Sequence, residues 1–156
     1  MSKKLSKKRK PKSKAKLIDE CATLLQKLVR LKAADHQGYC TCCTCGVRKH
    51  WKHMQGAHYI ERGKSYTKLM EENIHPSCEY CNMIGDKYVR EVKEAYSKFM
   101  RDLYGNDFVE HLFVLSRKEK KYSMPEVRDM LADLKQRVKE QEAQLESLRP
   151  TQEDDY

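Results

Sequence analysis

Hydrophobic residues first form a regular pattern between positions 17 and 34. They recur every three or four residues, at Leu17, Cys21, Leu24, Leu28 and Leu31. This spacing is that of an α-helix with one apolar face, and Gly38 marks the exit from it. The pattern predicts an amphipathic helix over 17–34, with Cys21 as a small hydrophobic residue of the core.

A second helical pattern begins at Asp86 and ends at Gly105, a residue type that suits the C-terminal end of a helix. Its apolar positions are Tyr88, Val92, Tyr96, Phe99 and Leu103. A shorter helix, about 107–116, is predicted to follow it. The apolar positions of this shorter helix are Phe108, Leu112 and Leu115.

The last helix has a sequence signal at each end. Ser123, Pro125 and Glu126 form the capping-box pattern at its start, and Pro150 stops it. Its apolar positions are Val127, Met130, Leu131, Leu134, Val138, Leu145 and Leu148. We expect this face to pack against the helix over 17–34, and the alternative is that it forms a dimer.

The central segment, 39–82, lacks a helical period. Residues 51–61 have strand-like character, 63–65 form a turn, and 58–60 are expected to form a short strand that faces a site. Helices at both ends around a small sheet predict an α+β fold.

Composition limits the size of this fold. A chain of 156 residues, 35% of them charged, has room for one domain with a small core, which a bound metal could stabilise. No apolar run approaches the roughly 18 residues that span a bilayer, and the charged start is not followed by a signal-peptide core. We therefore expect no membrane partner and a cytoplasmic location.

Charge is concentrated at the N-terminus. Residues 1–16 contain nine basic residues and no acidic one, and the whole chain carries +9. The rest of the chain is therefore neutral overall. Together with the helix patterns, this charge distribution predicts three parts: a disordered basic tail over 1–16, a main domain over 17–122, and a C-terminal helix with an acidic end over 123–156. The tail is typical of a nucleic-acid-binding arm; the alternative is a solubilising end.

Four cysteines form two Cys-x-x-Cys pairs, Cys42 with Cys45 and Cys78 with Cys81. In a chain without a secretion signal, paired cysteines at this spacing favour metal ligation over disulfides. The two pairs predict one structural zinc that joins the ends of the intervening segment.

Cys40 and Cys43 offer a competing first pair. We choose Cys42 and Cys45 because Gly46 follows them directly and lets the backbone turn tightly, so that amides face the sulfurs. Cys40 and Cys43 are then spare thiols.

Three polar residues inside or next to this zinc-joined segment carry the chemistry. His58 precedes the predicted turn, Asn73 lies five residues before Cys78, and Asn82 follows Cys81. The arrangement resembles that of the HNH, or His-Me finger, nucleases, in which a β-hairpin and a helix surround one divalent metal. The resemblance implies a zinc-stabilised ββα-metal core flanked by amphipathic helices.

The same resemblance implies a role for each residue. His58 is the general base, Asn73 orients it or ties the hairpin together, and Asn82 offers an oxygen to Mg²⁺ or Mn²⁺. Arg62 and Lys64 bind the substrate phosphate. A structural or zinc-ligating role for His58 stays open as the alternative.

One position departs from that pattern. Many HNH nucleases have an aspartate directly before the histidine as a second metal ligand, and this chain has Ala57. Gln55 and His53 are the candidate substitutes. Weak binding of the catalytic metal follows from this departure.

A wider set of segments is similar to the phage lambda NinG (Rap) family over residues 17–140. The segments are LVRLK at 28–32, GYCTCCTCG at 38–46, RKHWKHMQ at 48–55, HY at 58–59, ENIHP at 72–76, and the second Cys-x-x-Cys pair with the asparagine that follows it, at 78–82. The resemblance implies an endonuclease that acts on branched recombination intermediates, such as Holliday junctions and D-loops, in a bacterial host cell. Its implied partners are DNA, a second copy of the chain and other phage recombination proteins.

Two rival functions remain at this stage. One is a catalytically silent zinc module that binds DNA and supports recombination, which the alanine at position 57 favours. The other is a protein-interaction adaptor that uses the C-terminal helix.

Overall fold

The computed structural model describes residues 10–150. The first nine residues of the predicted basic tail and the acidic end, 151–156, lie outside the described residues. Within the described part, no helix is both long enough and apolar enough to cross a bilayer.

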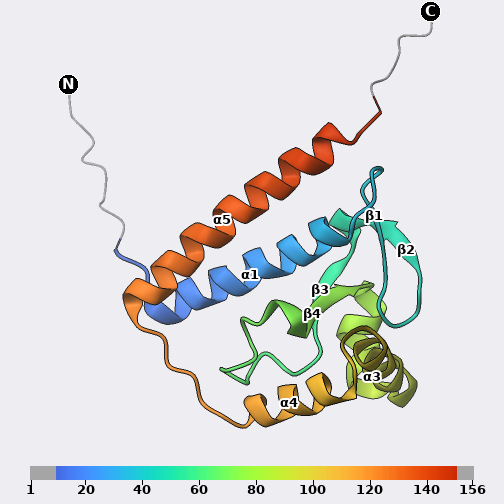
Figure 1. The fold of residues 1–156 in the computed structure, drawn as a ribbon, viewed down its shortest axis with the longest axis horizontal. Helices are drawn as coiled ribbons and strands as arrows, with labels where there is room; N and C mark the ends of the chain where they lie inside the picture. Colours follow the sequence, from blue (N-terminus) through green and yellow to red (C-terminus); the bar gives the residue numbers. More distant parts are fainter. Residues whose placement is uncertain (1–9, 151–156) are drawn as a thin grey trace, which may run out of the picture.

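Two long helices, α1 (Lys14–Ala33) and α5 (Met124–Ser147), lie side by side and run in the same direction (Figure 1). Early residues of one helix contact early residues of the other, since the Cys21 thiol faces the Val127 carbonyl oxygen. Leucine and valine side chains from both helices form the largest buried cluster of the molecule. The predicted packing of the first helix against the last is therefore confirmed.

The start of α1 differs from the prediction. It begins at Lys14, because the Ser13 hydroxyl accepts a hydrogen bond from the Lys16 backbone N–H at 3.3 Å and caps the helix. The segment 1–16, predicted to be disordered, thus ends in a helical turn. At α5 the predicted capping box is confirmed, with hydrogen bonds in both directions between Ser123 and Glu126.

Two short antiparallel hairpins pack near α1. In Figure 1 the first lies at the C-terminal end of α1 and the second lies below the helix. One joins β1 (Tyr39–Thr41) to β2 (Arg48–His50), and the other joins β3 (Gln55–His58) to β4 (Ile74–Ser77). In the second hairpin, α1 packs directly on the backbone. A side chain at Gly56 would have its Cβ 2.6 Å from the Cβ of Gln26, so the close approach requires glycine.

The strand predicted over 51–61 is shorter than expected. Trp51–His53 forms a 3₁₀ turn, and β3 ends at His58, so the predicted strand 58–60 is wrong beyond its first residue. The cause is Asn73, whose side-chain oxygen accepts from the Ile60 N–H at 2.8 Å. The Ile60 N–H therefore donates to a side chain, whereas in a longer strand it would donate to a backbone carbonyl of the neighbouring strand.

The helical region after the second cysteine pair is broken into pieces. A π-helix spans Tyr80–Gly85, α2 is the single turn Asp86–Tyr88, and α3 runs over Arg90–Tyr104. Val89 adopts an extended conformation between α2 and α3, so the predicted continuous helix from 86 is wrong. The break turns Tyr88 outward, and Leu103 near the other end of the predicted stripe is exposed as well.

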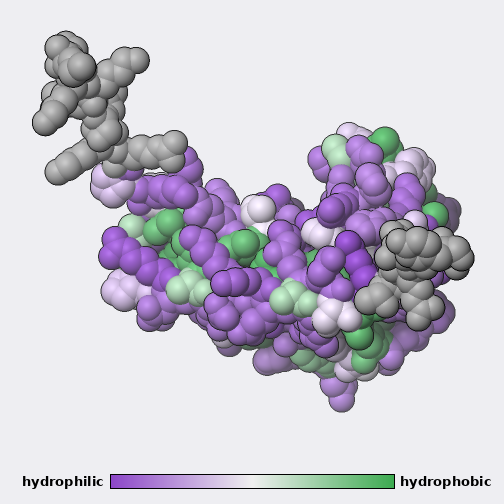
Figure 2. Space-filling view, turned by 90° about the horizontal axis from the view of Figure 1, so that it is seen from above, coloured by the Kyte–Doolittle hydropathy of each residue, from purple (hydrophilic) through white to green (hydrophobic). Residues whose placement is uncertain are grey.

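The remaining helix, α4 (Asn106–Ser116), agrees with the prediction and starts at Gly105, which has φ of 85°. Together with α3 it covers the side of β3 and β4 opposite to α1 (Figure 1). A second buried cluster fills this space, formed by Ala57, Ile60, Tyr96, Met100, Val109 and Leu112. On the face drawn in Figure 2 hydrophilic residues dominate, and the hydrophobic ones form small patches between them.

Together, the two hairpins and the helices give the predicted α+β mixture of helices and small sheets. The hairpin of β3 and β4 lies between two helical layers, and the helical segment with Asn82 follows β4 directly. A further short 3₁₀ turn, Glu71–Asn73, leads into β4.

Candidate functional site

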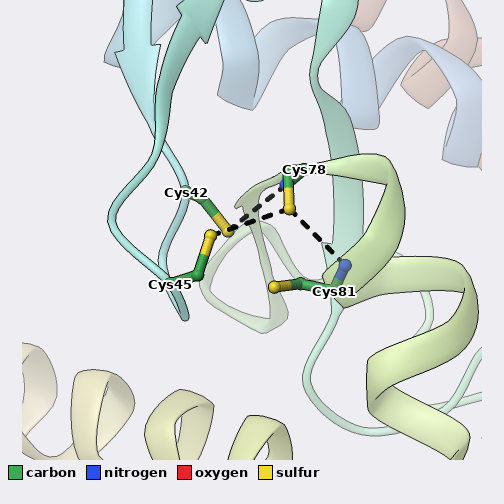
Figure 3. Close-up of side chains that lie close together, drawn as sticks. All are labelled: Cys42, Cys45, Cys78 and Cys81. Carbon is green, nitrogen blue, oxygen red and sulfur yellow. Dashed lines mark hydrogen bonds between the residues drawn. The ribbon is translucent and has the colours of Figure 1, made fainter.

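The four predicted zinc ligands come together at one point (Figure 3). Cys42 and Cys45 lie on the loop between β1 and β2, and Cys78 and Cys81 lie where β4 passes into the π-helix. Their sulfur atoms all lie within 4.8 Å of one another. A tetrahedral zinc with Zn–S bonds of about 2.3 Å sets its sulfurs about 3.8 Å apart, and the sulfurs of Cys45 and Cys78 are 3.7 Å apart. The cluster could therefore hold a zinc ion.

Hydrogen bonds to sulfur prepare this cluster for a cation. The Cys78 backbone N–H donates to the Cys42 sulfur at 3.3 Å, and the Cys81 N–H donates to the Cys78 sulfur at 3.5 Å. Burial alone would raise the pKa of Cys42, but hydrogen bonds from the Thr44 hydroxyl and nearby backbone amides lower it to about 5. A thiolate, the form that binds zinc, is thus stabilised at this position.

The geometry favours Cys42 and Cys45 over the competing pair. Gly46 adopts φ of 76°, as the tight turn after Cys45 requires. The Cys40 side chain is buried beside the cluster without joining it, and Cys43 packs on the second hydrophobic cluster. Neither belongs to the group of four cysteines that could hold a metal.

His58 lines a cavity of about 520 Å³ that opens beside the cysteine cluster. Residues from α1, β3, the loop after β3 and the π-helix all contribute to its wall. Its lining includes Gln26, Arg30, Gln55, Gly56, Glu61, Arg62, Asn82 and Lys87. The cavity therefore gathers His58, Asn82 and Arg62, three of the residues that the sequence predicted to work together.

The orientation of His58 follows from one hydrogen bond. Its Nε2 lies 2.9 Å from the Lys68 carbonyl oxygen. A carbonyl oxygen only accepts, so in the neutral ring Nε2 carries the hydrogen and Nδ1 carries the lone pair. Burial lowers the pKa of His58; the hydrogen bond to the Lys68 carbonyl opposes this, and the nearby charges of Arg62 and Lys68 lower the pKa further. The imidazole is therefore neutral at physiological pH, with a basic Nδ1.

Asn73 is fully buried and holds the loop between β3 and β4 in shape. Its Nδ2 donates to the carbonyl oxygens of Ile60 at 3.0 Å and Thr67 at 3.1 Å, and its Oδ1 accepts from Ile60. Of the two roles predicted for it, these contacts match tying the hairpin together. The contact that orients His58 comes from Lys68, on the loop that Asn73 fixes.

Asn82 contacts Gln55 at one edge of the cavity. The Asn82 side chain lies on the π-helix, and its Nδ2 donates to the Gln55 Oε1 at 2.6 Å. Gln55 is at the start of β3, so two amide side chains from different elements share one edge of the cavity that His58 lines. His53, the other candidate substitute for the absent aspartate, lines a separate cavity with Gln55.

Ala57 points away from this cavity. It is buried in the second hydrophobic cluster, and its carbonyl oxygen accepts a hydrogen bond from the Tyr96 hydroxyl at 2.7 Å. A carboxylate at position 57 would lose its water without gaining a cationic partner. The fold around position 57 is therefore built for a small apolar residue.

The two predicted phosphate-binding residues lie on neighbouring cavities. Arg62 lines the His58 cavity, whereas Lys64 lines an adjoining one of about 730 Å³ that His58 also borders. His75, whose role the sequence left open, is a core residue. Its ring nitrogens lie 3.3 Å from the Tyr96 hydroxyl and 2.9 Å from that of Tyr104, and burial lowers its pKa to about 4.

Sequence reasoning missed Arg30 of α1. Its Nη1 donates to the carbonyl oxygens of Met54 at 2.8 Å and Trp51 at 3.3 Å, and no ion pair within residues 10–150 includes it. Burial lowers the pKa of Arg30, which shows the cost of holding this charge away from water. The signal in the sequence was an arginine between Val29 and Leu31, two residues that are both buried in α1.

Comparison with known proteins gives one match. The model of the family described as "Bacteriophage Lambda NinG protein" matches residues 2–144. No curated protein and no solved structure matches the chain.

Proposed function

The chain belongs to the bacteriophage lambda NinG family, a family related to phage recombination, and from this premise we propose that it is a metal-dependent DNA endonuclease for branched recombination intermediates. The observation that carries the proposal is the His58 cavity, in which a neutral imidazole, three amide side chains and three lysine or arginine side chains line one space. The zinc-stabilised ββα core of HNH nucleases is part of the proposal. The hairpin β3–β4 and the helical segment after it follow the order of that core.

In this proposal His58 takes a proton from the water that attacks the phosphodiester. The lone pair on Nδ1 receives the proton, while the Nε2–H bond to the Lys68 carbonyl keeps the ring fixed and stabilises the imidazolium that forms. The lowered pKa of His58 keeps the base unprotonated near neutral pH. A fixed base is favoured because proton transfer depends on alignment as much as on basicity.

The catalytic metal would be held by oxygen atoms. The Asn82 and Gln55 side-chain carbonyls and the Glu61 carboxylate line the cavity, and such oxygens are the donors that Mg²⁺ and Mn²⁺ prefer. When bound, the ion would stabilise negative charge on the phosphate and on the departing oxygen. The hydrogen bond between the two amides uses the Asn82 Nδ2, so the Asn82 Oδ1 is the atom that would bind the metal.

The phosphate would be bound by the cations of the same wall. Arg30, Arg62 and Lys87 line the cavity, against the single carboxylate of Glu61. Arg30 is the most fixed of them, because the backbone carbonyls of Gln26, Trp51 and Met54 hold its guanidinium. A guanidinium without a carboxylate partner suits the planar, anionic oxygens of a phosphodiester.

A silent zinc module that binds DNA is the second candidate. The apolar surroundings of Ala57 favour it, because the position used for an acidic metal ligand in many HNH nucleases is here part of the core. The two candidates differ in one property, which is strand cleavage that depends on a divalent metal.

The test uses zinc-loaded protein with a labelled four-way junction and a linear duplex of matched sequence, in magnesium or in EDTA. We expect cuts in the junction with magnesium and none with EDTA, and Asn82→Ala should require a higher magnesium concentration. Tight binding without cuts in either metal would reject the nuclease and support the silent module. Cuts that persist in EDTA would reject the role of the metal.

A further inference from the structure

Four large apolar side chains lie exposed on the segment 80–88, which begins inside the second cysteine pair. These are Tyr80, Met83, Ile84 and Tyr88, with exposed fractions of 55%, 53%, 51% and 81%. Across residues 10–150 nine large hydrophobic residues are exposed, and these four fall within nine positions of the chain. We call them the apolar ridge. An exposed apolar group of this kind marks an interaction site more often than chance.

The local backbone brings three of the four ridge residues to one side of the segment. Tyr80, Ile84 and Tyr88 follow each other at intervals of four residues, which brings side chains together on a helical segment. Most of this segment is the π-helix Tyr80–Gly85, a conformation that is rare in proteins and frequent at functional sites. The same π-helix carries Asn82, which lines the His58 cavity.

The ridge segment lies next to two cavities lined by cations. Asn82 and Lys87 of this segment line the His58 cavity. Glu79, the residue directly before the segment, lines a second cavity of about 660 Å³ beside the β1–β2 hairpin. Both cavities share Met54 and Gln55 in their walls.

Met83 of the ridge contacts this shared wall. The Gln55 Nε2 donates to the Met83 sulfur at 3.6 Å. A polymer that occupied both cavities would therefore pass over or beside the ridge.

The charges of the two cavities indicate the nature of that polymer. Lys49 and Lys52 line the second cavity together with Arg48, which is ion-paired with Asp35, and Glu79 is the single carboxylate in its wall. The His58 cavity also has three lysine or arginine residues against one carboxylate. Two cationic sites with apolar and aromatic side chains between them are complementary to a nucleic acid strand, whose phosphates are anionic and whose bases are flat and apolar on their faces.

We propose that the apolar ridge binds unstacked bases at a discontinuity in DNA, while the two cavities bind phosphates on either side. The inference rests on the proposed function and names the feature of the substrate that the site recognises. In a continuous duplex the faces of the bases are covered by stacking, so the ridge finds them only at a branch point, a fork or an unpaired stretch. Tyr80 and Tyr88 supply the stacking surfaces, and Met83 and Ile84 supply apolar contact.

The test measures binding without cleavage, in EDTA, by fluorescence anisotropy. The DNA probes are a linear duplex, the same duplex with an unpaired fork, and a four-way junction. The main variant is Tyr80→Ala; Tyr80→Phe retains the ring, and Leu103→Ala removes an exposed apolar side chain of α3, outside the ridge. Thermal unfolding checks that the folds are equal, which is expected because these side chains are exposed.

We expect Tyr80→Ala to weaken binding to the fork and the junction about tenfold or more, and to change duplex binding less than twofold. Tyr80→Phe and Leu103→Ala should bind as the unchanged protein does. A 2-aminopurine base at the unpaired position should lose fluorescence on binding the unchanged protein and keep it with Tyr80→Ala.

Equal losses on all three DNAs, or no loss on any, would overturn the inference. So would a change from dimer to monomer in sedimentation without a change in DNA selectivity, since the ridge would then join two copies of the chain. Failure of the proposed function gives a different result. If the unchanged protein bound no DNA, both proposals would be wrong. Binding without magnesium-dependent cuts would reject the nuclease alone, and the binding measurements would then decide the role of the ridge.

Discussion

The cysteine cluster and the His58 cavity are neighbours that are built in opposite ways. The cluster uses four identical ligands from two short sequence pairs, and their sulfurs converge on one point. The cavity uses different residue types from α1, β3, a loop and the π-helix, and its shape depends on how these elements pack. Substitutions in the cysteine cluster should therefore cost zinc binding and folding together, whereas substitutions around the His58 cavity should change its shape or chemistry and leave zinc binding intact.

The largest expected effect breaks the cluster. Cys78→Ser should remove zinc and unfold the chain together, because binding of a structural zinc supplies roughly 10 kcal/mol or more of folding free energy. Zinc content and circular dichroism measure the two losses. Cys43→Ala, which changes a thiol outside the cluster, should keep both zinc and fold. A folded Cys78→Ser protein without zinc would show that the cluster is dispensable.

The next effect weakens the cavity while leaving the cluster intact. Asn73→Ala removes a buried side chain and leaves three backbone groups of Ile60 and Thr67 without their partner. We expect a loss of about 3 kcal/mol in the free energy of unfolding, with zinc content unchanged. Urea unfolding measures it. A loss below about 0.5 kcal/mol, the range of ordinary surface substitutions, would contradict the role of Asn73 in holding the loop.

A smaller effect concerns pH and the core behind β4. The folded pKa of His75 is about 4, below the value of about 6.5 in an unfolded chain. As pH falls from 7 to 5, the unfolded chain gains a proton at this position and the folded one does not, so stability falls by about 2 kcal/mol.

His75→Phe removes this group and keeps an aromatic ring. Its stability should therefore fall less between pH 7 and pH 5 than that of the unchanged protein, by about the same 2 kcal/mol. Urea unfolding of both proteins at each pH gives the difference, in which acid effects on the shared cysteines cancel. Parallel pH curves would mean that His75 is protonated in the folded state.

The smallest effect lies outside both sites. Deletion of residues 2–9 removes five basic residues and stops before the Ser13 cap of α1. If the tail contacts phosphates, the salt dependence of DNA binding should become less steep by up to about four in the log–log slope, with unfolding unchanged. The same slope before and after deletion would favour the solubilising role of the tail.

The contrast between the two sites also explains what the sequence could predict. The cysteine cluster could be found because each pair is local, and Gly46 separated the true pair from Cys40 and Cys43. The helices α1, α4 and α5 could be found because one face of each is regularly apolar. These are properties of residues close together in the chain.

Features that depend on tertiary contacts were missed or misjudged. The end of β3 at His58 depends on Asn73, fifteen residues later, and the break at Val89 has no glycine or proline to announce it. Arg30 joins the cavity only because α1 packs on β3. The roles of His58 and Asn82 came from a family pattern, and they stay predictions until activity is measured.

The most direct measurement compares zinc content and single-turnover cleavage of a four-way junction for the unchanged protein and His58→Ala, with His111→Ala, an exposed histidine of α4, as control. The central claim is that the cysteine cluster stabilises the fold and that His58 is the general base in DNA cleavage. It predicts that His58→Ala keeps one zinc per chain, its thermal stability and its DNA affinity, and loses cleavage by roughly a hundredfold or more. Cleavage by His58→Ala at the rate of the unchanged protein would contradict the claim.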